Sequence, residues 1–145
     1  YNYRLSDIQC ALGASQMERL DDFLARRKQL AQWYGELLVG VPHVRPAPDH
    51  PGHAWHIYPL WVEPVLRRQV FEGLREREIG VQVHYPLVSS HPYYVDRYGP
   101  QKGSFPEAER ISGGEISLPM FPAMEDRDVD RVVDVLKNIL ESVAP

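Results

Sequence analysis

The prolines of this 145-residue chain all follow residue 41, and their distribution limits how the chain can fold. There are 13 of them, and the first is Pro42. Proline ends or kinks an α-helix, because it lacks an amide hydrogen and its ring clashes with the preceding turn. The first 40 residues are therefore free to form one long helix, whereas the remainder favours short elements joined by loops.

The segment before the first proline carries the signals of such a helix. Ser6 and Gln9 have the spacing of a capping box at a helix N-terminus. Apolar residues then recur at steps of three and four, namely Leu20, Phe23, Leu24, Leu30, Ala31, Tyr34, Leu37 and Leu38. The pattern predicts one helix over about 6–38, bent near Gly13, with the basic run 26–28 on its solvent face.

The part of the chain that contains the prolines predicts a small sheet packed with helices. Loops are expected at 42–52 and 86–103, where prolines cluster. The expected strands are 54–62, 81–85 and 116–121, and the expected helices are about 64–80, 105–111 and 126–142. Pro59 has no amide hydrogen to donate, so its strand is expected at a sheet edge or with a bulge there.

The order of these elements predicts an α/β fold class, more closely an α+β small domain. A long N-terminal helix is followed by a small sheet of about three strands packed with helices. The length of 145 residues suffices for a core without disulfides or metal.

Composition argues against several classes of function. The net charge is −4, which does not favour a broad surface for nucleic acid. No apolar run approaches the ~20 residues that cross a membrane. The single cysteine, Cys10, leaves no partner for a disulfide within the chain. We therefore expect a cytoplasmic domain that binds neither nucleic acid nor membrane.

A metal site is not expected. His53 and His56 are three residues apart, a spacing that brings ligands together on a helix but not on a strand. The expected strand turns their side chains to opposite faces, and no other ligand residue stands nearby at the spacing of a structural zinc site. The chain also contains no nucleophile elbow, dinucleotide fingerprint or phosphate-binding loop.

Two segments carry polar and aromatic side chains where ligands commonly bind. Asn2 and Arg4 precede the expected helix start, where unpaired amide groups suit a phosphate or a carboxylate. His84 and Tyr85 stand where an expected strand ends, which is a common ligand position in α/β proteins. A purely structural role remains the alternative for both pairs, and neither pair names an activity.

Five segments in a fixed order carry a resemblance. They are YNYRLSDIQCALG, HAWHIYPLWV, REIGVQVHYPLVSSHPYY, FPEAERISGGEISLPMFP and the last expected helix. Together they resemble the C-terminal part of the DegT/DnrJ/EryC1/StrS family of sugar aminotransferases, which have the aspartate-aminotransferase fold (fold type I) and use pyridoxal 5'-phosphate (PLP). The third segment is most similar to members that aminate UDP-linked 4-keto-6-deoxy sugars.

The resemblance implies an activity that this chain does not carry alone. In the family a lysine binds PLP covalently, glutamate usually donates the amino group, and a UDP- or dTDP-linked keto sugar accepts it. That lysine lies upstream of YNYR, and none of the lysines present stands in its motif: Lys28, Lys102 and Lys137. The resemblance therefore implies that residues 1–40 link to an absent large domain that binds most of the cofactor, that 41–145 form the small C-terminal domain, and that the fragment is inactive.

The resemblance also assigns roles to single residues. Asn2 matches an asparagine that reaches the PLP phosphate of the neighbouring subunit in a homodimer. Arg4 would lie near the same site and bind phosphate or the carboxylate of the amino donor. The candidate residues for the nucleotide-sugar are His84 and Tyr85, followed by the weaker pair His56 and His53.

Two alternatives stay open. Some members of the family are sugar dehydratases, in which a histidine replaces the lysine, so the residues that precede Tyr1 in the parent gene would decide between transfer and dehydration. The chain could also be a free-standing domain for binding or assembly only, in which case a native start codon would lie close to Tyr1.

Overall fold

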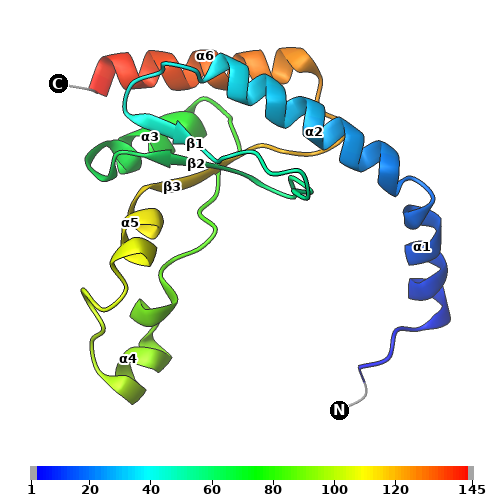
Figure 1. The fold of residues 1–145 in the computed structure, drawn as a ribbon, viewed down its shortest axis with the longest axis horizontal. Helices are drawn as coiled ribbons and strands as arrows, with labels where there is room; N and C mark the ends of the chain where they lie inside the picture. The colour runs from blue at the N-terminus through cyan, green and yellow to red at the C-terminus, as the bar shows by residue number, and fades with distance from the viewer. Residues whose placement is uncertain (1–2, 144–145) are drawn as a thin grey trace.

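The computed structural model describes residues 3–143, which form a three-stranded antiparallel sheet packed with helices (Figure 1). Its elements are α1 (Asp7–Met17), α2 (Leu20–Leu37), β1 (Val44–Pro46), β2 (Tyr58–Val62), α3 (Pro64–Glu76), a 3-10 turn (Val88–Ser90), α4 (Pro92–Tyr98), α5 (Pro106–Gly114), β3 (Glu115–Leu118) and α6 (Asp126–Val143). The expected α+β small domain is confirmed.

Strand β2 is the central strand, so the prediction that Pro59 places it at an edge is wrong. Ser117 of β3 exchanges both backbone hydrogen bonds with Gln82, which makes its pairing with Pro59 the type without hydrogen bonds. The nitrogen of Pro59 therefore faces the other side, where β1 has already ended at Pro46, opposite Leu60. No sheet hydrogen bond is lost by having a proline there.

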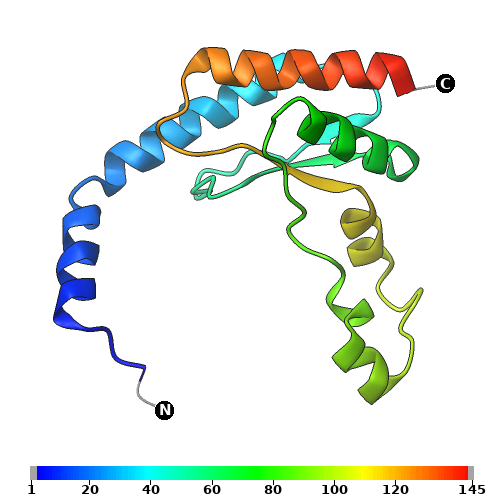
Figure 2. The same cartoon turned by 180° about the vertical axis from the view of Figure 1, so that it is seen from behind.

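One face of the sheet carries the hydrophobic core. Helices α2 and α6 lie side by side over the sheet, and α3 packs against α6 (Figures 1 and 2). Large side chains buried there include Leu30, Tyr34 and Leu38 near the end of α2, Tyr58, Leu60 and Val62 of β2, Val70 and Leu74 of α3, Ile116 of β3, and Val129 and Leu136 of α6. The three-and-four spacing of α6 thus predicts its buried face correctly.

The expected single long helix is wrong, because the chain breaks it at Glu18 and Arg19. Helix α1 begins as predicted: the Ser6 Oγ accepts from the Gln9 amide (3.4 Å) and the Gln9 side chain accepts from the Ser6 amide (2.8 Å). Its last turn ends at Met17, four residues beyond the expected bend. No residue of α1 is buried, so no packing holds it on the axis of α2.

Three further expectations need correction. The expected loop 42–52 contains β1, because Val44 is buried and pairs with the central strand. The expected loop 86–103 contains the 3-10 turn and α4, which has Pro92 at its first position. The expected strand 81–85 is reduced to one bridge at Gln82, since the chain then turns away from its neighbour.

Two projections extend from the same side of the body (Figure 2). One contains α1, and the other contains α4 with the segments that connect it to the sheet and to α5. Both expose large apolar side chains, among them Tyr3, Leu5, Ile8 and Leu12 on the first and Tyr85, Val88, Tyr93 and Tyr98 on the second.

Two tyrosines pack against each other in the core. The rings of Tyr34 and Tyr58 stack with centroids 4.6 Å apart, and the Tyr34 hydroxyl donates to the carbonyl oxygen of Pro119 (3.0 Å). Burial raises the pKa of both phenols well above the usual 10.0, and for Tyr34 the neighbouring Tyr58 and Asp128 raise it further. Both side chains therefore stay protonated in the folded protein at pH values where an unfolded tyrosine ionises.

We expect the free energy of unfolding to fall as the pH rises above about 10, because the unfolded chain then loses protons that the folded chain keeps. Each of the two tyrosines contributes a slope of about 1.4 kcal/mol per pH unit. Tyr34→Phe should remove one of these contributions, which urea unfolding between about pH 9 and about pH 11 would measure. The exposed Tyr98→Phe is the matched control, and equal slopes for Tyr34→Phe and the wild type would contradict the prediction.

Candidate functional site

Two polar side chains of β3 point away from the hydrophobic core. Paired residues of an antiparallel sheet lie on the same face, so Glu115 lies beside Trp61 and Ser117 beside Pro59. The core residues of β2 alternate with these positions and face the other way. Glu115 and Ser117 are nevertheless only 5% and 4% exposed, so this second face is covered as well.

His84 is hydrogen-bonded to both of these side chains. Its backbone N–H donates to Oε2 of Glu115 (2.7 Å), and its Nδ1 lies 2.9 Å from Oγ of Ser117. The Ser117 hydroxyl in turn donates to Oε1 of Glu115 (2.5 Å). The three residues thus form a closed hydrogen-bonded ring, which satisfies polar groups that burial would otherwise destabilise.

Tyr85 continues from this cluster toward solvent. Its side chain is 71% exposed, and its ring stands edge-on to that of His84 with centroids 4.9 Å apart. The peptide bond between the two residues is cis, and the carbonyl oxygen of Tyr85 accepts from the Ser112 hydroxyl (3.3 Å). The structure therefore keeps the predicted His84 and Tyr85 together, with the imidazole half-buried and the phenol open to a ligand.

Glu115 and Ser117 were not among the residues that the sequence singles out. The pattern that could have identified Glu115 and Ser117 is their alternation with Ile116 and Leu118, in a strand that is buried along its whole length. Polar residues at alternate positions of a buried strand need partners on one face, because unpaired buried polar groups are costly. The partner, His84, is 31 residues before Glu115, so the spacing alone does not identify it.

His53 and His56 lie in the segment before β2 rather than in a strand, which corrects the expectation for them. Both are exposed. The Nδ1 of His53 accepts from the Trp55 amide (2.9 Å), and its ring lies over the Trp55 ring. His56 lines a hollow of about 760 Å³ between α2 and residues 121–123. Among the contacts of residues 3–143, none joins either histidine to His84.

Of the two candidate residues for binding the PLP phosphate, Asn2 and Arg4, the structure describes Arg4. Asn2 lies outside the described residues. Arg4 is exposed and precedes α1, on the projection that leads away from the sheet (Figure 1). The neighbouring helix N-terminus is already capped by Ser6.

The three lysines and Arg4, the phosphate candidate that the structure describes, lie in separate parts of the chain. A PLP enzyme needs a lysine for covalent attachment beside groups that bind the pyridine nitrogen and the phosphate. Lys28 and Lys102 are exposed, on α2 and in the turn after α4. Lys137 lies on the C-terminal half of α6, at the opposite end of the molecule from the segment that contains Arg4 (Figures 1 and 2). Among residues 3–143, the three lysines and Arg4 therefore do not form a PLP site within one chain.

Residues 3–143 contain neither a metal-ion site nor a membrane-spanning helix. In that range no three His, Cys, Asp or Glu side chains gather closely enough to hold a metal ion. Within the same range, no helix has the length and the apolar content to cross a membrane.

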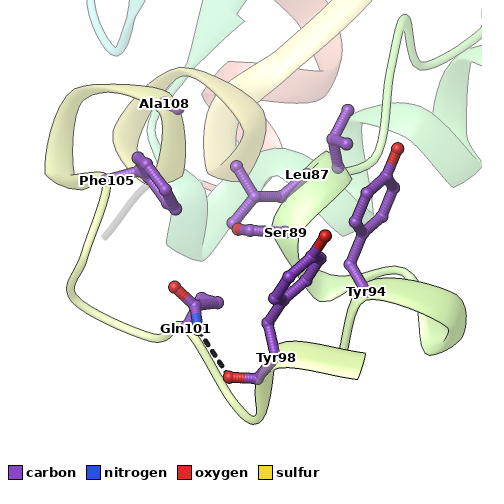
Figure 3. A pocket seen from close by; sticks show the side chains of 8 residues that line it. Leu87, Ser89, Tyr94, Tyr98, Gln101, Phe105 and Ala108 are labelled. Carbon is purple, nitrogen blue, oxygen red and sulfur yellow. Dashed lines mark hydrogen bonds between the residues drawn. The ribbon is translucent and has the colours of Figure 1, made fainter. Parts of the chain in front are cut away.

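An aromatic hollow follows the His84 cluster along the chain (Figure 3). It has a volume of about 600 Å³ and lies between the 3-10 turn, α4 and the start of α5. Its lining is mainly apolar and consists of Leu87, Val88, Ser89, Tyr94, Tyr98, Gln101, Phe105 and Ala108. The Gln101 side chain donates to the Tyr98 carbonyl (3.0 Å), which fixes the turn that closes the hollow. Such a lining can accept a planar or apolar group.

Comparison with known proteins identifies related chains. The model of the DegT/DnrJ/EryC1/StrS aminotransferase family matches residues 1–137. The spore coat polysaccharide biosynthesis protein SpsC of Bacillus subtilis is 36% identical over 148 residues, which cover 97% of this chain and 38% of SpsC. This chain thus spans little more than a third of that relative.

Solved structures share the fold. PseC of Helicobacter pylori, an aminotransferase involved in the biosynthesis of pseudoaminic acid, is 26% identical with a TM-score of 0.88, over 98% of this chain and 39% of that one. Spr1654 of Streptococcus pneumoniae, solved in its PMP form, is 25% identical with a TM-score of 0.89, over 97% of this chain and 36% of that one.

Proposed function

Because this chain belongs to the DegT/DnrJ/EryC1/StrS aminotransferase family, we propose that it is the C-terminal portion of a PLP-dependent sugar aminotransferase. The observation that carries the proposal is the extent of the matches. The family model matches residues 1–137, and the similarity to SpsC covers 97% of this chain but only 38% of SpsC. The whole enzyme would transfer an amino group from glutamate to a nucleotide-linked keto sugar, in the class of UDP- or dTDP-linked 4-keto-6-deoxy sugars. The name of SpsC supports a role in polysaccharide biosynthesis.

The division of the chain follows from this proposal. Residues 1–40 link to a large domain, and residues 41–145 form the small C-terminal domain. The complete lack of buried residues in α1 supports a linking role, because a helix of 11 residues gains little stability without packing. The proposed active form is a homodimer, in which a second subunit completes each site.

The residues of this chain would bind and orient the substrate, while PLP, held mainly by the large domain, would supply the electron sink for amino transfer. His84 and Tyr85 would contact the nucleotide-sugar, since one is anchored and the other is open to solvent. His53 and His56 are secondary candidates for the same ligand. Asn2 and Arg4 would contact the PLP phosphate, or the carboxylate of the amino donor, across the dimer.

The proposal is tested on the full-length protein with its two half-reactions measured separately. We expect amino transfer from glutamate, and then to a UDP- or dTDP-linked 4-keto-6-deoxy sugar. His84→Ala should lower kcat/KM for the sugar by about tenfold, the cost of one hydrogen bond to the substrate, and leave the glutamate half-reaction unchanged. Stopped-flow absorbance of the cofactor reports both.

His50→Ala is the matched control, because this histidine is exposed in the loop before β2. The 145-residue chain alone should retain no PLP on a lysine after borohydride reduction. Equal losses in both half-reactions for His84→Ala would contradict the role of His84. A sugar that is deoxygenated but not aminated would point to a dehydratase, and covalent PLP on the chain alone would contradict the inactivity of the fragment.

A further inference from the structure

The hydrogen-bonded ring around His84 determines which of its ring nitrogens carries a proton. A serine hydroxyl has one proton to donate, and an ionised carboxylate can only accept. With Glu115 as a carboxylate, the proton of Ser117 is therefore directed at Oε1 of Glu115 (2.5 Å). The Ser117 oxygen, 2.9 Å from Nδ1 of His84, can then only accept from that nitrogen. Nδ1 of His84 must therefore carry a hydrogen, whether the ring is neutral or charged.

Glu115 is held in the orientation that makes this assignment. Its second oxygen, Oε2, accepts from the backbone N–H of His84 (2.7 Å), so the carboxylate cannot turn away from Ser117 without losing that bond. Both Glu115 and Ser117 are buried, at 5% and 4% exposed, which excludes competing water from most of their surfaces. The donor and acceptor order runs in one direction, from His84 through Ser117 to Glu115.

The other ring nitrogen of His84 is open. Among residues 3–143, the only buried side-chain nitrogen or oxygen without a hydrogen bond is Nδ1 of His43, which lies 3.2 Å from Oε2 of Glu63. Nε2 of His84 takes part in none of the hydrogen bonds of the described residues, so it must be accessible to solvent. In the neutral ring this nitrogen has a free lone pair and accepts a hydrogen bond.

We infer that Glu115 and Ser117 are positioning residues that hold His84 as its Nδ1–H tautomer and so present Nε2 as a hydrogen-bond acceptor to a hydroxyl group of a bound ligand. The tautomer follows from the contacts within this chain alone. The identity of the ligand as a sugar rests on the proposed function. In that site Nε2 would accept from a sugar hydroxyl.

The first test is nuclear magnetic resonance on the 145-residue chain labelled with ¹⁵N, in which two-bond proton–nitrogen correlations show which ring nitrogen is protonated. The signals of His84 are assigned by their loss in His84→Gln. Above the pH at which the ring becomes neutral, we expect Nδ1 to be protonated and Nε2 to be bare. A ring with its proton on Nε2, or one that exchanges between both tautomers, would overturn the inference.

Glu115→Gln gives the sharper result, since it preserves the shape of the side chain. The amide oxygen would keep the backbone N–H of His84, which leaves the amide NH₂ group facing Ser117. Ser117 would then accept from Gln and donate to Nδ1, so the proton of His84 should move to Nε2. Ser117→Ala should instead leave the two tautomers in exchange. An unchanged His84 pattern in both variants would overturn the inference.

Ser112→Ala is the matched control, because its hydroxyl binds the Tyr85 carbonyl rather than the His84 ring. It should keep the wild-type tautomer of His84. If Ser112→Ala instead brings the two tautomers into exchange, as expected for Ser117→Ala, then any loosening of this region suffices, and the inference is overturned. In the full-length protein, Glu115→Gln should lower kcat/KM for the sugar by about tenfold with the glutamate half-reaction unchanged. A shifted tautomer with unchanged sugar kinetics would count against the proposed role of His84 in sugar binding, not against the tautomer.

Discussion

Gly114→Ala is expected to lower the free energy of unfolding by about 3 kcal/mol, the upper part of the range for overfilling a packed site. A Cβ at this position would overlap the carbonyl oxygen of Val62 and Nε1 of Trp61, and would stand 2.6 Å from Cδ1 of the same indole. The first of these atoms belongs to the backbone of the central strand. The indole is held as well, because its Nε1 donates to the Arg110 carbonyl (3.0 Å). Neither neighbour can move without breaking a sheet or a helix contact.

Urea unfolding followed by tryptophan fluorescence would measure this loss. The matched control is Gly113→Ala, one residue earlier in α5, where a Cβ would meet only Cγ of Pro64 at an ordinary 3.9 Å. That variant should stay within about 0.5 kcal/mol of the wild type or gain stability, since alanine favours a helix. Similar losses for both variants would show that helix geometry, rather than contact with β2, explains the effect.

Arg27→Ala is expected to lower the free energy of unfolding by a similar amount, about 3 kcal/mol. The Nη1 of Arg27 donates to the carbonyl oxygens of Trp55 (2.9 Å), His56 (2.9 Å) and Met120 (3.1 Å). One half-buried side chain on α2 thus ties together the segment before β2 and the segment after β3. Its removal leaves three carbonyl groups without this donor, two of them in partly buried surroundings.

Arg27→Lys separates geometry from charge. A lysine keeps the positive charge but cannot reproduce the planar fork of the guanidinium, so it should recover less than half of the lost stability. Lys28→Ala is the control, because the neighbouring lysine is exposed and lies outside this contact. Full recovery by Arg27→Lys would show that charge alone stabilises the joint. A loss in Lys28→Ala equal to that in Arg27→Ala would point to helix propensity instead.

Local signals in the sequence predicted the elements that depend on local chemistry. The capping box of Ser6 and Gln9, the apolar stripe of α6 and the proline at the start of α3 all appear where the pattern puts them. The failures share a different cause. The break at Glu18 and Arg19 separates α1, which has no buried residue, from α2, whose C-terminal half packs into the core. A continuous apolar spacing cannot reveal which part of a helix will have a packing partner.

The central position of Pro59 also depends on tertiary structure. The rule that excludes proline from central strands assumes a neighbour on each side of every residue. Here β1 ends at Pro46, opposite Leu60, one residue before the position at which residue 59 would have to donate a backbone hydrogen bond. Strand β1 itself lies in a stretch whose prolines indicate a loop, and of its three residues Val44 alone is buried.

The candidate site divides in the same way. The sequence singles out His84 and Tyr85, because an imidazole and a phenol at the end of an extended segment are typical of ligand sites, and their role in ligand binding stays a prediction. It does not single out Glu115 and Ser117, since their relation to His84 is made by the register of β3 against the chain at Gln82. The prediction that Arg27 lies on the solvent face is wrong for a similar reason. Its three acceptors are backbone carbonyl oxygens, which every residue has, so no pattern of side chains in the sequence indicates them.

The hydrogen bonds from Arg27 to the three backbone carbonyls do not depend on pH. The guanidinium does not lose its proton at any pH that proteins experience, and a backbone carbonyl does not gain one. The neighbouring Arg26 makes a contact of the same kind, since its Nη2 donates to the carbonyl oxygen of Met124 (2.6 Å) as well as to the Asp126 carboxylate (2.9 Å). Because neither partner in these arginine–carbonyl contacts changes its protonation state with pH, the attachment of α2 to the two segments that flank the sheet persists in acid for as long as the sheet itself.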